Sequence, residues 1–176
     1  MASVTGPRPS VPSFPPNEEY GAHGGGQDAA EREAWPAISR RIGESELYWL
    51  ATTRPDGRPH AVPIGGSWYE DRLYFNMSPR TVSARNLVGG APVCVHLESA
   101  MEVVIIEGGA TVLPPPDVPA TVLEDYGRKY GGGVSSYDPA DPELPWFALE
   151  PNRVLFWLGE DIRNTAVRWV FSRGRK

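Results

Sequence analysis

The sequence has few of the residues that build metal sites and hydrolytic centres. It contains one cysteine, Cys94, and three histidines, His23, His60 and His96. A lone cysteine forms neither an internal disulfide nor a CxxC metal site, and no HExxH, Walker A or nucleophile-elbow motif is present. We therefore expect no bound metal ion. The inventory suits an enzyme whose chemistry is supplied by an organic cofactor.

Long apolar runs and excess positive charge are also missing. No stretch approaches the roughly 20 apolar residues that span a bilayer, and the N-terminus lacks the pattern of a signal peptide. The net charge of -5 disfavours nucleic acid and anionic membranes as partners. We expect a cytoplasmic protein. Its 176 residues, of which 40% are hydrophobic, are enough for one domain with a real core.

Proline and glycine divide the chain into a tail and a domain. Residues 1–30 hold five prolines between Pro7 and Pro16 and the run Gly24-Gly25-Gly26. Such a segment buries too little apolar surface to offset the entropy lost on ordering. We therefore predict a disordered tail over 1–30 and a folded domain over 31–176.

The domain alternates between short apolar runs and turn residues, which is typical of a β-meander. The pattern predicts helices over 35–43, 81–87 and 117–130. It predicts strands over 47–53, 58–68, 73–77, 92–97, 102–113, 153–158 and 166–171. Many strands with short connections predict a mainly β fold, either a barrel or a sandwich. Glu107 is the odd polar residue in its apolar strand and needs either an arginine partner or an exposed position.

The polar segment 78–87 is the main candidate for ligand binding. Arginine and hydroxyl side chains meet there at the start of a predicted helix, where free backbone N–H groups favour a phosphate. An ordinary capped surface helix with solvated arginines explains the same composition. The candidate donors are Ser78, Arg80, Thr81, Ser83 and Arg85.

Several segments, taken in order, carry a family resemblance. They are WLATT (49–53), DGRPHAVP (56–63), LYF (73–75), RNL (85–87), the stretch from Pro145-Trp146 through Pro151 to Phe156-Trp157, and RWVF (168–171). Over about residues 35 to 172 the chain resembles the split β-barrel flavoproteins related to pyridoxamine 5'-phosphate oxidase. It is similar especially to the branch with flavin- and deazaflavin-dependent oxidoreductases.

The resemblance implies a six-stranded antiparallel split barrel that forms a homodimer, with a cofactor at the subunit interface. It also implies three groups of cofactor-binding residues. The phosphate tail would contact Ser78, Arg80, Thr81, Ser83, Arg85 and Asn86. The ring would lie over His60, Val62, Pro63 and Ile64, and Arg168 and Trp169 of a second subunit would cover the site.

Two departures from the family pattern bear on the activity. Many relatives carry a lysine at the position of Ser83, which keeps a donor but lacks the charge. The stretch Arg-Leu-His-Asp-Arg of the true pyridoxamine phosphate oxidases is replaced by residues 163–168 without histidine, so vitamin B6 oxidation is not the expected activity.

The resemblance implies hydride transfer between FMN or coenzyme F420 and a small substrate that the sequence does not identify, and no catalytic side chain is nominated. The alternative is a protein of this fold that binds a cofactor or haem without turnover. His60 and His96 are the candidate axial ligands in that case.

Overall fold

A computed structural model describes residues 8–10, 35–131 and 144–171, with the backbone alone at 8–10, 163 and 164. The predicted boundary at residue 31 and the loop 132–143 lie outside these residues. Within the predicted tail, Arg8–Ser10 form a short strand. None of the helices in the described part of the chain is long and apolar enough to cross a membrane.

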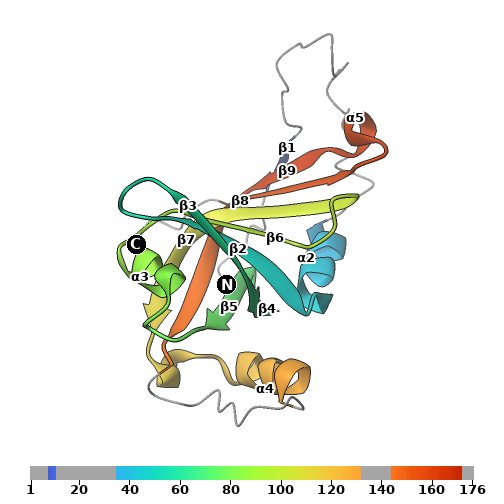
Figure 1. The fold of residues 1–176 in the computed structure, drawn as a ribbon. Coiled ribbons are helices and arrows are strands. Elements are labelled where there is room, and N and C mark those ends of the chain that lie inside the picture. The colour runs from blue at the N-terminus through green and yellow to red at the C-terminus, as the bar shows by residue number, and fades with distance from the viewer. Residues whose placement is uncertain (1–7, 11–34, 132–143, 172–176) are drawn as a thin grey trace.

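The described residues form one curled antiparallel sheet with helices at its margins (Figure 1). The strands are β1 (Arg8–Ser10), β2 (Leu47–Thr53), β3 (Pro59–Gly65), β4 (Ser67–Tyr69), β5 (Arg72–Asn76), β6 (Val93–His96), β7 (Glu102–Leu113), β8 (Trp146–Leu158) and β9 (Val167–Val170). The helices are α2 (Trp35–Glu44), α3 (Val82–Val88), α4 (Ala120–Tyr130) and α5 (Ile162–Thr165), with a 3-10 turn at Pro115–Asp117.

The sheet splits along β8, which is 13 residues long. One edge of β8 pairs with β7 along its length. The other edge pairs with β5 at Trp146–Leu149 and with β9 at Arg153–Phe156. The strand order is β1-β9-β8-β7-β6-β2-β3, and β4 and β5 branch from β8. This curled half-barrel confirms the predicted mainly β, antiparallel fold. The sheet has nine strands where the resemblance implied six. β9 corresponds to the predicted strand over 166–171, the predicted strand over 58–68 is divided into β3 and β4, and β1 was not predicted.

Period-two alternation gives the sheet an apolar inner face. Leu50, Val95, Val104, Ile106 and Phe156 are fully buried, and their neighbours in sequence point to the opposite, outer face. α2 closes one end of this core with Ile38 and Ile42, both 0% exposed. The strand patterning therefore separates a packed interior from an outer face free to bind something else.

The predicted helix over 117–130 is α4 preceded by a 3-10 turn, and it packs Val122 and Tyr126 into a second apolar cluster. Lys129 anchors it: the side chain is 3% exposed, and its ammonium donates to the carbonyls of Gly43 and Ser45 at 2.7 and 2.9 Å. Burial lowers the pKa of Lys129, although the carboxylate of Asp125 opposes that shift. The buried lysine thus ties α4 to the end of α2.

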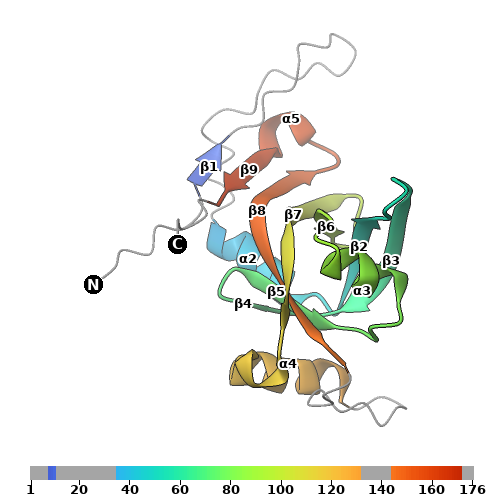
Figure 2. The ribbon, with the colours of Figure 1, turned by 90° about the vertical axis from the view of Figure 1, so that its left-hand side faces the viewer.

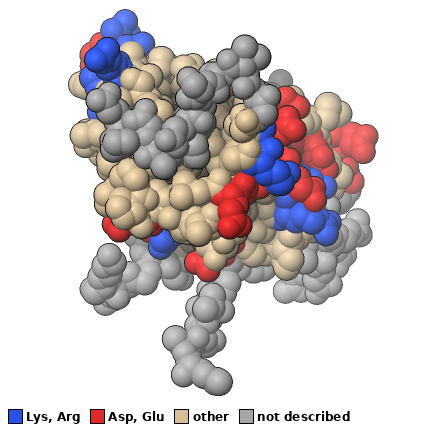
Figure 3. Space-filling model, turned by 90° about the horizontal axis from the view of Figure 1, so that it is seen from below, with Lys and Arg blue, Asp and Glu red and all other residues tan. Residues whose placement is uncertain are grey.

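The face that carries α4 shows acidic and basic side chains beside one another (Figure 3). The pair Arg128–Asp125, at 2.6 Å, belongs to this helix. Both signs are interspersed here, so this surface does not present the one-sign field that attracts a polyanion.

A β-bulge interrupts the β7–β8 ladder beside the outer face. Glu107 pairs with Arg153, but Gly108 pairs with Pro151, so Asn152 is the extra residue. The bulge brings two backbones together: a Cβ on Gly108 would lie 2.1 Å from the carbonyl oxygen of Glu150. Only glycine fits this position without a backbone shift.

We expect Gly108→Ala to lower the free energy of unfolding by about 1–3 kcal/mol, as overpacking in a close-packed region does. Gly109→Ala is the matched control, since a Cβ there meets nothing within 4 Å, and its stability should equal or slightly exceed that of the parent. Chemical denaturation of the three proteins measures the difference. Equal destabilisation of both variants would contradict the proposed clash.

Candidate functional site

Two rows of side chains cross the outer face of the sheet in register. The first row runs through Trp49, His96, Ile105, Leu155 and Arg168. Strand pairing alone brings together residues from five strands that are distant in sequence.

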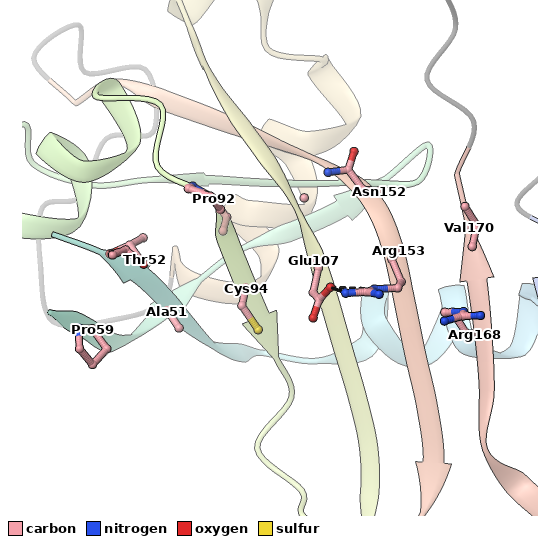
Figure 4. Close-up of a pocket in the computed structure, with 13 residues that line it drawn as sticks. Ala51, Thr52, Pro59, Pro92, Cys94, Glu107, Asn152, Arg153, Arg168 and Val170 are labelled. Carbon is pink, nitrogen blue, oxygen red and sulfur yellow. Dashed lines mark hydrogen bonds and ion pairs between the residues drawn. The ribbon is translucent and has the colours of Figure 1, made fainter. Parts of the chain in front are cut away.

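The second row runs through Ala51, Cys94, Glu107, Arg153 and Val170. On each strand, its member lies two residues from the member of the first row. These five form the floor of a groove of about 660 Å³ (Figure 4). Arg168, from the first row, and Asn152, from the bulge, also line it. The groove is therefore built on rigid strands.

The groove floor carries an ion pair at its centre. Nε of Arg153 donates to Oε2 of Glu107 at 2.7 Å, and Nη2 donates to the same oxygen. Burial, followed by the Glu107 carboxylate, raises the pKa of the Cys94 thiol, which faces the groove from β6. The floor thus combines apolar surface with one carboxylate, two arginines and a protonated thiol.

A second cleft of about 310 Å³ adjoins the groove, and the two share Thr53 and Pro92 as lining residues. It lies between the β2–β3 hairpin and α3, which are neighbours in both ribbon views (Figures 1 and 2). Arg54, from the hairpin, and Arg85, from the helix, line it. Both hollows therefore carry guanidinium groups, and the groove adds apolar surface.

The residues of the predicted phosphate segment lie in different surroundings. Thr81 caps α3, as predicted, and its Oγ1 accepts from the Ala84 N–H at 3.2 Å. The Thr81 hydroxyl donates a hydrogen bond to the backbone carbonyl of Ser78. The Arg80 side chain is exposed. Ser83 is 1% exposed, and its Oγ has no hydrogen-bond partner among the described residues.

Of that segment, the structure places Arg85 and Asn86 in the second cleft. Nδ2 of the buried Asn86 donates to Oγ1 of Thr52 at 2.9 Å. Because Thr52 lines the groove and Asn86 lines the cleft, this bond forms part of the wall between them.

The predicted ring-binding residues of β3 are divided between the two sheet faces. Ile64 is buried in the core and Val62 packs against it, whereas Pro63 is exposed in register with Trp49. Nδ1 of His60 accepts from Nη2 of Arg54 at 3.3 Å, since a guanidinium only donates. β3 contributes Pro59, not these four, to the groove lining.

The predicted pair on β9 also separates. Arg168 lines the groove. Trp169 is 1% exposed and packs in the core against Trp35, with ring centroids 5.4 Å apart. Arg168 is thus exposed to the groove, while Trp169 packs β9 onto the core.

Sequence reasoning missed Arg54, Cys94 and Arg153 as site residues. Glu107 was recognised as an odd polar group, and the structure identifies its arginine partner as Arg153. The signal available was the period-two pattern: an inner face at Val93 and Val95 implies an outer face at Cys94. Among the described residues, no three His, Cys, Asp or Glu side chains group as a metal site.

The family model for pyridoxamine 5'-phosphate oxidase matches residues 34–158 of the chain. The chain belongs to this family. The match spans the outer-face strands β2, β3, β6, β7 and β8 and the cleft beside α3. A search of curated proteins gives no match.

Solved structures with this fold include an F420 reductase, the haem storage protein HutZ from Vibrio cholerae and a pyridoxamine 5'-phosphate oxidase-related FMN-binding protein from Nostoc punctiforme. Their TM-scores are 0.53, 0.58 and 0.50, at 19%, 18% and 17% identity. The alignments cover 65%, 72% and 83% of this chain and 94%, 97% and 87% of those chains. At these identities the similarity shows the fold alone.

Proposed function

We propose that the chain is an oxidoreductase that binds FMN or coenzyme F420 in the groove and transfers a hydride to or from a small organic substrate. The groove on the outer face carries this proposal, because it combines apolar surface with arginine side chains and adjoins a cleft that carries two more arginines. Family membership supports it, as do neighbours of the same fold that are an F420 reductase and an FMN-binding protein.

The residues present suit a flat ring with an anionic tail. Ala51, Val93, Pro59 and Pro92 give apolar lining, and a ligand ring buried against such surface is stabilised by the area removed from water. Arginines suit phosphate because their planar donors match its oxygens. The donor set and the apolar surface thus fit a flavin-type group.

When bound, the cofactor supplies the hydride chemistry, and the chain's residues bind and orient it. Arg168 and Arg153 offer positive charge to the groove, and the Glu107 carboxylate fixes the guanidinium of Arg153. The strand backbone keeps these groups at fixed spacing, which preserves the alignment that hydride transfer requires.

A second copy of the chain is the proposed partner on the outer face. Leu47, Trp49 and Val170 are 54%, 40% and 44% exposed on it. A two-fold dimer places the same surface of both subunits face to face. These exposed apolar side chains would then be buried against those of the second subunit. The groove would then lie at the junction between subunits, as the family resemblance implies.

Haem is a second candidate ligand, favoured by the orientation of His96. Its Nδ1 is 2.8 Å from the carbonyl of Leu97, so it carries the hydrogen and Nε2 keeps a free lone pair. His60 has the opposite tautomer, because its Nδ1 accepts from Arg54. His96 also stacks on Trp49 with an interplanar angle of 16°, and one neighbour of this fold is a haem storage protein.

Purified protein should bind FMN or the deazaflavin coenzyme with a dissociation constant in the micromolar range or below, at about one per subunit. The measurement is a side-by-side fluorescence titration of both cofactors, followed by reduction of the bound one. Binding of neither would contradict the proposed oxidoreductase.

The Trp49→Glu variant should be monomeric, since a charge in the centre of an apolar interface is left unpaired. Val112→Glu is the control, because Val112 is 47% exposed but belongs to neither row. Light scattering after size exclusion reports the mass. A monomeric parent, or two dimeric variants, would argue against this interface.

If haem is the ligand, His96→Ala should weaken haemin binding at least tenfold and shift the Soret band, whereas His60→Ala should leave both unchanged. The measurement is an absorbance titration of the parent and both variants. Equal haemin affinity in the parent and His96→Ala would remove haem from consideration.

A further inference from the structure

We infer that a cleft between α2 and the β4–β5 turn binds an organic cation, and that the ligand class is an alkylated ammonium ion. This hollow, which we call the α2 cleft, has a volume of about 700 Å³. No described residue lines both the α2 cleft and the groove, or both the α2 cleft and the cleft beside α3. The inference is therefore independent of the proposed cofactor site.

Two tryptophans form an aromatic corner in the α2 cleft. Trp35 begins α2 and Trp68 lies on β4, and their ring centroids are 6.4 Å apart with an interplanar angle of 67°. Both indole N–H groups are used within the protein. Nε1 of Trp35 donates to Oδ1 of Asp71 at 3.0 Å, and Nε1 of Trp68 donates to Oγ of Ser39 at 2.9 Å. The rings are thereby fixed, and they offer a ligand π surface in place of a polar donor.

The core holds this corner in place from behind. The ring of Trp35 packs against Trp169 and Phe171, with centroids 5.4 and 5.2 Å away. On the side of α2, a Cβ on Gly43 would lie 3.9 Å from Cβ and Cδ1 of Trp68. Because glycine has no side chain, this part of Trp68 stays uncovered, and both indoles remain partly exposed.

Carboxylates outnumber cations in the α2 cleft. Glu44, Glu70 and Asp71 line it, against the single guanidinium of Arg40. Nε of Arg40 lies 3.9 Å from Oε1 of Glu44, so these two charges offset each other. Neither Glu70 nor Asp71 forms an ion pair within the part of the chain that the structure describes. Two negative charges are thus left beside the aromatic corner.

Asp71 is the carboxylate whose surroundings most favour a cation. It is half-buried, and burial raises its pKa, although the hydrogen bond from Trp35 opposes this shift. The next residue, Arg72, is engaged elsewhere, since its Nη2 lies 3.0 Å from Oε1 of Glu150. Partial burial strengthens the attraction between the Asp71 carboxylate and a positive ligand compared with an open surface.

The groups in the α2 cleft suit an organic cation better than a metal ion. Hard metal ions require several converging oxygen ligands, and the described residues contain no cluster of three His, Cys, Asp or Glu side chains that could supply them. An alkylated ammonium ion carries its charge on alkyl groups that pack against indole faces. It needs no hydrogen-bond acceptor, and the carboxylates attract it through charge alone.

The test compares choline with its neutral isostere dimethylbutanol, in which carbon replaces the nitrogen. The indole N–H signals of the protein are followed by NMR during both titrations, without any cofactor present. Choline should shift the signals of Trp35 and Trp68, and it should leave that of Trp49, on the outer face, in place. The parent should bind choline with a dissociation constant of about 1 mM or below, and the isostere about fivefold more weakly or worse.

Two variants remove one component each. Trp68→Leu removes an aromatic face, and Asp71→Asn removes a charge while keeping an acceptor for Trp35. Asparagine also tolerates the φ of 57° at this position, so this variant tests the site even if Trp68→Leu is destabilised. Glu150→Gln is the matched control, because it removes a nearby charge that does not line the α2 cleft.

Trp68→Leu and Asp71→Asn should each weaken choline binding about 3- to 30-fold, and Glu150→Gln should stay within about twofold because solvent and salt screen a more distant charge. No choline binding by the parent, or equal affinity for the neutral isostere, would overturn the inference. Equal losses in Asp71→Asn and Glu150→Gln would also overturn it, since they would indicate general attraction to an acidic surface.

Discussion

The β7–β8 pairing is the constraint on which the rest of the structure depends. These two long strands are paired from one end, where Glu102 lies opposite Leu158, to the other, where Leu113 lies opposite Trp146. Because β8 then divides its other edge between β5 and β9, a single strand joins the core beneath α4 to the groove on the outer face. The bulge at Asn152 lies between those two pairings, where the strand must bend. Gly108 permits that bend, and Glu107 and Arg153 follow immediately beside it. Core packing and ligand binding therefore share one backbone feature.

The groove owes its chemistry to register, because a slip of one residue would exchange the two faces of a strand. In the observed register Cys94, Glu107 and Arg153 face outward while Val95, Ile106 and Val154 are buried. The buried apolar row thus specifies which polar row is exposed. Core residues that never touch a ligand position the charges that would.

Local pattern made most of the strands, α2, α3, α4 and the Thr81 cap predictable, because period two, turn residues and capping chemistry act over a few positions. It predicted neither β1 nor α5, and it predicted only the second half of β8. The split of β8 and the nine-stranded order were not predictable, since they depend on pairings between residues far apart in sequence. The phosphate segment illustrates the same limit. Its composition indicated candidate donors, but only the structure shows that Ser83 is buried and that Arg85 lines a cleft together with Arg54. Likewise, only the structure shows that Trp169 packs against Trp35.

Two of the edge strands of the branched sheet contain proline: β1 carries Pro9, and β3 carries Pro59 and Pro63, whereas the third edge strand, β4, has none. Proline has no N–H to donate to a further strand and is typical of edge strands. At β1 and β3 it therefore disfavours the addition of another strand. A two-fold dimer through the outer face, as proposed above, would end after two copies instead of extending into a fibre.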